Sequence, residues 1–187
     1  MGVDDESDAQ IVAGLRRGDP GAFDRAYGRY HARVHAFLHR MAGRREVADD
    51  LVQETWLKLA RHATTLREDT DLAAYLFTIA RNAYRSFRRW AWLDATRVDA
   101  YSEETAFVES ATPEAEVAVR RRHAALEKAL IAISPADREV LLLVGVDGMG
   151  QDQAAMVLGI EHAAMRKRVE RARERLAAKL EAMEASR

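Results

Sequence analysis

The residues with the clearest chemical potential are two clusters of arginine and lysine. From Arg81 to Arg89 the chain carries four arginines and no acidic residue, and from Arg166 to Lys179 it carries seven basic residues against two acidic ones. Arginines without acidic neighbours gain no salt bridges along a helix and repel one another unless a polyanion binds. The first cluster therefore indicates contact with nucleic-acid phosphates, and the second creates a local positive field that favours the same kind of partner. For the first cluster, a basic helix face that is merely solvated is the alternative.

Aromatic and polar side chains accompany the first cluster on a predicted helix over 71–92. One side of this helix carries the core positions Leu72, Leu76, Ile79, Ala80, Ala83 and Phe87. The opposite side and its flanks carry Tyr75, Thr78, Arg81, Asn82, Arg85, Arg88 and Arg89. Aromatic rings beside a basic face can stack on unpaired bases while arginines bind the backbone. This face predicts binding of single-stranded nucleic acid.

The second cluster lies in a predicted helix-turn-helix formed by helices over 151–158 and 162–185. Gly159 tolerates the left-handed backbone of the turn, and the inward side chains are Ala154, Ala155, Leu158, Met165, Val169, Ala172 and Leu176. The outward side of the second helix and its flanks offer His162, Ala163, Arg166, Lys167, Glu170, Arg171 and Arg173. A small residue near the tip allows close approach to base edges. An ordinary pair of surface helices is the alternative.

A third helix, predicted over 46–62, is apolar on two sides. Its core side carries Val47, Leu51, Val52, Thr55 and Leu59, and its other side carries Asp49, Gln53, Trp56, Leu57 and Ala60. Aromatic anchors rimmed by carboxylates and amides are typical of protein interfaces. We therefore expect Trp56 and Leu57 to be exposed and to bind a partner. A helix buried on both sides within the bundle is the alternative.

Catalytic and metal-binding interpretations have little support. The chain has no cysteine, no glycine-rich phosphate loop and no Ser-His-Asp order that spacing favours. His31, His35 and His39 share one helix face, but no carboxylate stands at ligand spacing between them, so they are expected to flank the core. The sequence predicts a protein that is not an enzyme and that has no cofactor and no metal.

Composition and periodicity predict an all-α protein. The 187 residues are 48% hydrophobic and 32% charged, and 29 basic residues nearly balance 30 acidic ones. We expect two small helical domains, a bundle over 1–93 and a helix-turn-helix domain over 118–187, joined by a flexible acidic linker over 94–117. Further helices are predicted over 8–17, 114–131 and 135–144. The acidic N-terminus and the lack of a long apolar run predict a cytoplasmic location.

Three stretches stand in order along the chain: DDLVQETWLKL at 49–59, AYLFTIARN at 74–82, and REVLLL at 138–143 followed by the helix-turn-helix that ends RARERL at 171–176. Together they resemble the extracytoplasmic-function group of bacterial sigma-70 RNA polymerase sigma factors. The resemblance covers nearly the whole chain. It implies a factor that binds core RNA polymerase and directs promoter recognition, promoter melting and transcription initiation.

The resemblance also implies roles for individual residues. The first stretch would dock on the clamp helices of the largest polymerase subunit through Asp49, Asp50, Gln53, Trp56 and Leu57. The second would melt and read the minus-ten element, and the helix-turn-helix would read the minus-thirty-five element as duplex. The acidic linker is similar to the segment that threads the RNA exit path. Expected partners are core RNA polymerase, promoter DNA and an anti-sigma factor, with no membrane insertion and no small-molecule substrate.

The chain departs from the usual pattern at four positions. Gly150 stands where a capping serine is usual, Gln153 where an acid is common, Ala164 where threonine is common, and Ser86 where aspartate is frequent. These differences bear on which promoter is read. The rival hypothesis is a dimeric helix-turn-helix regulator with an N-terminal sensor or dimerisation bundle, which would leave the basic helix over 71–92 without a role.

Overall fold

The computed structural model describes residues 7–95 and 114–185, and within these residues the chain is helical with no strand. This confirms the predicted all-α class. Most of the acidic segment over 94–117 lies outside the described residues. The α-helices are α1 (Asp8–Arg16), α2 (Pro20–Ala42), α3 (Arg45–His62), α4 (Leu72–Ala95), α5 (Glu114–Ala132), α6 (Pro135–Leu141), α7 (Gln151–Leu158) and α8 (His162–Ala185).

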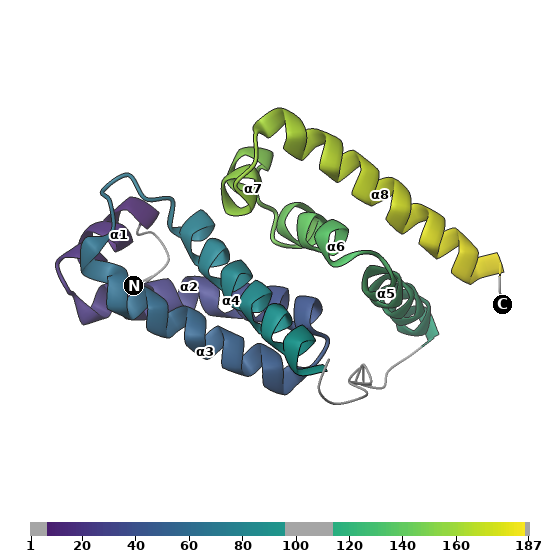
Figure 1. The fold of residues 1–187 in the computed structure, drawn as a ribbon, viewed down its shortest axis with the longest axis horizontal. Helices are drawn as coiled ribbons and strands as arrows, with labels where there is room; N and C mark the ends of the chain where they lie inside the picture. The colour runs from purple at the N-terminus through teal and green to yellow at the C-terminus, as the bar shows by residue number, and fades with distance from the viewer. Residues whose placement is uncertain (1–6, 96–113, 186–187) are drawn as a thin grey trace. The chain divides into compact units, whose positions relative to one another are not determined.

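The chain divides into two compact units, of which the first contains α1 to α4. Helices α2, α3 and α4 pack against one another, and α1 packs on α2 and on the short 3₁₀ turn η1 (Ala63–Thr65) that follows α3 (Figure 1). The centre of the unit is apolar, with Phe37 and Phe77 in an edge-to-face contact whose ring centroids are 5.4 Å apart. Burial of these faces is the main force that holds the three long helices together.

Local signals in the sequence define where the helices of this unit begin. Ser7 and Gln10 form a reciprocal capping box at the start of α1. Asp19 caps α2 by accepting a hydrogen bond from the Gly21 amide, and this bond and Arg25 lower the pKa of the Asp19 carboxyl. Asp71 accepts a hydrogen bond of 2.9 Å from the Ala74 amide and so caps α4. The helix predicted over 8–17 is present as α1 and ends one residue earlier, at Arg16.

Helix α4 is the element that carries the first basic cluster. It runs for 24 residues from Leu72 to Ala95 with no glycine or proline inside it. Leu72, Leu76, Ala80 and Ala83 are buried as predicted, and so are Phe77 and Tyr84, which the wheel did not assign to the core. A long uninterrupted helix fixes the spacing of the side chains on its exposed face.

The second unit contains α5, α6, α8 and most of α7. Helix α8 packs along α5 and α6. The buried Arg138 donates hydrogen bonds to the backbone carbonyls of Leu130 and Ile131 at the end of α5, which fastens α6 to α5. Ser134 caps α6 through the Asp137 amide. Each of these bonds satisfies a backbone group that a helix end leaves unpaired.

Two details of the second unit bear on the sequence predictions. The helix predicted over 135–144 ends at Leu141 and continues as a π-helical turn, η2 (Leu142–Val146), because apolar spacing does not distinguish these two hydrogen-bond patterns. Gly159 has φ 64°, so the predicted left-handed pivot between α7 and α8 is confirmed. Among the described residues, no helix has the length and apolar character needed to cross a bilayer.

Candidate docking face and nucleic-acid interfaces

The expected docking face lies on α3 and is only partly exposed. Asp49, Asp50, Gln53 and Leu57 are exposed, and Leu57 keeps 49% of its surface open to solvent. The core positions Leu51, Val52, Thr55 and Leu59 are buried as predicted. An exposed leucine beside an amide and two carboxylates fits a protein interface with a small apolar centre.

The expectation that Trp56 is exposed is wrong. Its side chain is only 6% exposed, because it lies against the rings of Phe23 and Tyr27 on α2, at centroid distances of 5.8 and 4.8 Å. The helical wheel of α3 places Trp56 at the boundary between the side that faces α2 and the side that faces solvent. The aromatic partners on α2 decide the outcome, and Trp56 belongs to the core of the first unit.

A row of histidines on α2 lies beside this face. Consecutive ring centroids of His31, His35 and His39 are 6.2 and 6.1 Å apart, and Tyr27 stacks on His31 at 4.3 Å. His35 Nε2 lies 2.9 Å from Asp49 Oδ1, a contact between helices that the spacing of the sequence did not reveal. In the part of the chain that the structure describes, no three His, Cys, Asp or Glu residues are grouped to hold a metal ion.

The predicted nucleic-acid face of α4 is present and basic. Asn82, Arg85, Arg88 and Arg89 are exposed, whereas Tyr75, Thr78 and Arg81 are half-buried. The Thr78 hydroxyl donates to the Ala74 carbonyl at 2.7 Å, and burial raises the pKa of the Tyr75 hydroxyl. The exposed Asn82 and the three exposed arginines are the groups with the freest access to a nucleic acid.

Two exposed tryptophans at the end of α4 have no role in the sequence predictions. Trp90 is 61% exposed and Trp92 is 68% exposed. A signal was available, since both lie within three residues of the end of the arginine run at Arg89. Trp90 lines a groove between α3 and α4 together with Val47 and Phe87, which explains why these two predicted core residues are only half-buried.

The predicted reading face of α8 is fully open. Met165, Val169 and Ala172 are buried, and His162, Ala163, Arg166, Lys167, Glu170, Arg171 and Arg173 are all exposed. His162 Nδ1 lies 2.5 Å from Asp152 Oδ1, so the first residue of α8 is tied to α7. The tie and the Gly159 turn hold the start of α8 in a fixed position relative to α7.

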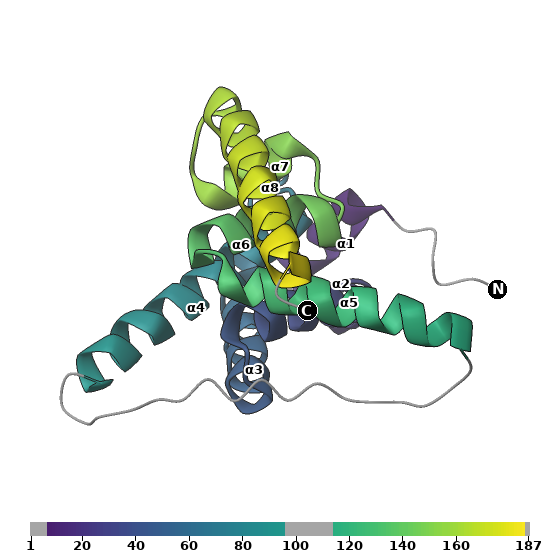
Figure 2. The same cartoon turned by 90° about the vertical axis from the view of Figure 1, so that its right-hand side faces the viewer.

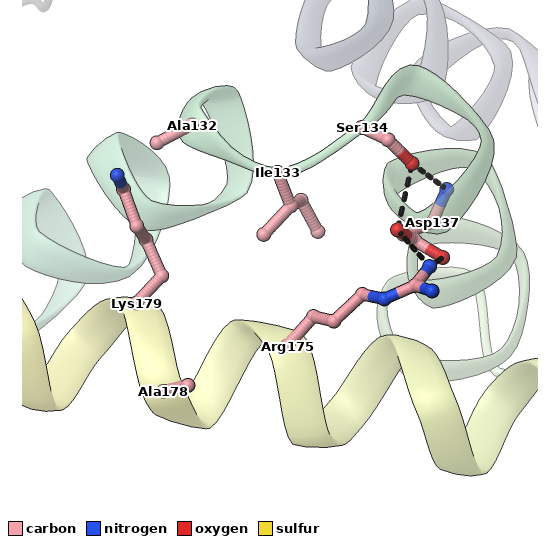
Figure 3. Close-up of a pocket in the computed structure, with 7 residues that line it drawn as sticks. All are labelled: Ala132, Ile133, Ser134, Asp137, Arg175, Ala178 and Lys179. Carbon is pink, nitrogen blue, oxygen red and sulfur yellow. Dashed lines mark hydrogen bonds and ion pairs between the residues drawn. The ribbon is translucent and has the colours of Figure 1, made fainter.

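The opposite flank of α8 is used within the second unit. Arg175 donates to both carboxylate oxygens of Asp137 at 2.9 and 2.8 Å, and Asp137 is also bonded to Ser134 at the start of α6 (Figure 3). These residues line a hollow with Ile133 and Lys179. Arg175 therefore positions α8 on α6, which leaves Arg166, Lys167, Arg171 and Arg173 for a ligand.

Comparison with known proteins shows that the helices carrying these three faces, α3, α4 and α8, belong to two regions of one protein family. Residues 26–93 match the family profile "Sigma-70 region 2", and residues 123–176 match "Sigma-70, region 4". The chain is 34% identical to RNA polymerase sigma factor CarQ of Myxococcus xanthus over 164 residues, which cover 87% of this chain and 91% of CarQ. The chain belongs to the extracytoplasmic-function group of sigma-70 factors.

Other relatives of this sigma factor agree. It is 35% identical to ECF RNA polymerase sigma factor EcfG of Rhodopseudomonas palustris over 144 residues, 77% of each chain. The structure of the sigma factor RpoE in complex with the anti-sigma factor NepR from Bartonella quintana matches it with a TM-score of 0.74 and 27% identity, covering 85% of this chain and 96% of that one. CnrH in complex with the cytosolic domain of CnrY gives a TM-score of 0.71 at 25% identity, covering 95% and 99%.

Family membership defines what this sigma factor does. It binds core RNA polymerase and promoter DNA and directs transcription initiation. The rival hypothesis of a dimeric regulator treats the N-terminal helices as a sensor or dimerisation bundle. Residues 26–93 of these helices instead match region 2 of the sigma-70 factors. The sigma factor hypothesis is therefore preferred over the regulator hypothesis.

Proposed function

We propose that three exposed faces divide the work of initiation, within domains at 1–93 and 118–187 separated by the acidic segment at 94–117. The face of Asp49, Asp50, Gln53 and Leu57 on α3 docks on the polymerase. The basic face of α4 opens and holds the minus-ten region. The outward face of α8 reads the minus-thirty-five region as duplex.

The observation that carries this proposal is the basic face of α4. Arg85, Arg88 and Arg89 are exposed, form no ion pair with the described part of the chain, and share the face with the exposed Asn82. No acidic residue occurs from 72 to 93. A helix of this charge favours a polyanion, and the amide of Asn82 adds a group that can hydrogen-bond to a base.

The docking proposal depends on Leu57 now that Trp56 lies in the core. Leu57 supplies the apolar centre, Gln53 supplies a neutral hydrogen-bonding group, and Asp50 adds a carboxylate on the rim. Asp49 is already engaged by His35, so its contribution to docking is smaller than that of Asp50. A compact apolar centre with a polar rim is the arrangement that carries most binding energy at protein interfaces.

The partners and location follow from the same proposal. RpoE and CnrH were solved in complexes with the anti-sigma factor NepR and with the cytosolic domain of CnrY, and we propose that an anti-sigma factor also controls this chain. The chain acts by binding, without catalysis of its own, and works in the cytoplasm together with the polymerase. Each basic helix alone buries too little DNA for tight binding, so the free chain should bind promoter duplex weakly.

The reading role of α8 can be tested by comparing basic residues at two positions along the helix, one in its first turns and one about two turns later. Replacing Arg166 or Lys167 by alanine should cost about 1–3 kcal/mol and relax preference at particular upstream base pairs, because the first turns of a recognition helix meet base edges. Replacing Arg173 should weaken all promoters alike, because it lies about two turns further along, where phosphate contact is expected. A promoter library transcribed with each variant measures both effects. Uniform loss for all three variants would mean that α8 only positions the protein.

A further inference from the structure

The C-terminal end of α4 exposes two large apolar rings that the proposed function does not use. Trp90 and Trp92 are 61% and 68% exposed, more than any other large hydrophobic side chain in the described residues. Figure 2 shows this end of α4 projecting clear of α2 and α3. A tryptophan ring combines a large apolar surface with one polar N–H group, and such rings are enriched at interfaces.

The two tryptophans belong to different faces of the helix. At about 100° per residue, Trp92 lies within about 20° of Arg85, whereas Trp90 is rotated by about 140° from it. Trp90 accordingly lines the groove beside Val47, Leu51 and Phe87. Trp92 stands on the basic face itself.

The surroundings of Trp92 select the chemistry of its partner. Arg88 and Arg89 precede it by four and three residues, so they occupy neighbouring positions on the same surface of the helix, and both are exposed without an ion pair in the described part of the chain. No acidic residue occurs between Leu72 and Leu93. A flat apolar ring among unpaired arginines fits a nucleobase attached to a phosphate backbone.

The continuous helix α4 holds Trp92 at a fixed distance from Asn82. Trp92 lies ten positions after Asn82 along one continuous helix, which corresponds to about 15 Å. This is the length of about four nucleotides of a strand. Trp92 is therefore placed to contact the DNA beyond the bases that Asn82 reaches.

We propose that Trp92 is a stacking residue that holds a base at one border of the melted region. This inference rests on the proposed role of α4 and adds a residue that extends its DNA contacts. The exposed indole of Trp92 stacks on an unpaired base or on the last base pair of the duplex, while Arg88 and Arg89 bind the adjacent phosphates. Trp90 takes no part in this contact.

The experiment uses full-length protein with core polymerase and a promoter that contains 2-aminopurine at one adenine position at a time, across the melted region and its borders. The variants are Trp92→Leu, Trp92→Phe and the matched control Trp90→Leu. With wild type, Trp92→Phe and Trp90→Leu, we expect one position whose fluorescence stays quenched by stacking. With Trp92→Leu, that position should brighten and the open-complex half-life should fall by about fivefold or more.

Three results would overturn the inference. One is that Trp92→Leu behaves like Trp90→Leu at every position. Another is that Trp92→Phe loses the fluorescence quenching and the open-complex half-life as fully as Trp92→Leu, although both proteins unfold at the wild-type temperature. Stacking needs only an aromatic ring, so phenylalanine should preserve it. The third is that Trp92→Leu weakens the association with core polymerase in the absence of DNA, which would identify a protein as the partner.

The proposed role of α4 is judged separately by an Asn82→Ala, Arg85→Ala double variant in the same assay. If the double variant fails to open the promoter while Trp92→Leu opens it normally, only the stacking inference is wrong. If the double variant also opens the promoter normally, α4 is not the opening element and the proposed function fails with it.

Discussion

Replacing Trp56 by alanine should destabilise the protein by about 3–5 kcal/mol, the range found when a buried aromatic residue is truncated. The indole is almost fully buried and packs against Phe23 and Tyr27, so its removal leaves a cavity between α2 and α3. The measurement is the midpoint of chemical unfolding, followed by circular dichroism. The slope of the transition should stay unchanged if the folded state keeps its structure.

Leu57→Ala is the matched control, because Leu57 follows Trp56 on the same helix and its side chain is exposed to solvent. It should change the free energy of unfolding by about 0.5 kcal/mol or less and still weaken binding to core polymerase. If Trp56→Ala unfolds at the wild-type midpoint and loses polymerase binding instead, Trp56 is a docking residue after all. If Leu57→Ala binds polymerase normally, the docking face has been placed on the wrong residues.

The Asn82→Ala, Arg85→Ala double variant should lose promoter opening while keeping its association with the polymerase. Two strand contacts are removed, one of them charged, and together they should raise the free energy of the open complex by about 2–4 kcal/mol. Permanganate reactivity of thymines in the melted region measures the loss. The dependence of promoter binding on salt should change little, since one phosphate contact alters the slope by only about 1.

An exposed arginine outside the three faces provides the comparison. Arg17, at the end of α1, is exposed and remote in sequence from the basic helix, so Arg17→Ala should open the promoter normally. Normal permanganate reactivity in the double variant would show that α4 does not hold the melted strand. Loss of polymerase binding by the double variant would show that α4 belongs to the docking surface.

Much of the fold could be predicted from the sequence because its signals are local. Helix α7 spans Gln151–Leu158, the range that the sequence predicts, and α1 begins at Asp8 as predicted. The outward residues of α8 are exposed because their inward neighbours at steps of three and four are apolar. A side chain whose burial depends only on its own helix can be placed from the sequence.

Contacts between helices could not be predicted from the spacing of residues within single helices. Trp56 was assigned to a docking face because its own helix did not show the rings of Phe23 and Tyr27 that cover it. The bond between His35 and Asp49 joins residues on two helices, and nothing in their spacing indicates it. The sequence predicts a basic face that ends at Arg89, and the exposure of Trp92 beyond it is a feature of the folded structure. Tertiary packing decides each of these cases.

The most direct test of the account compares transcripts made by core RNA polymerase alone with those made after this protein is added. When the protein is added, the RNA 5′ ends transcribed from a library of genomic DNA should be concentrated at a small set of start sites. These sites should share upstream and minus-ten sequences. The same DNA should show only weak binding by the protein alone. An unchanged set of start sites, together with nanomolar binding of the isolated chain to promoter duplex at physiological salt, would contradict the account and favour a dimeric regulator.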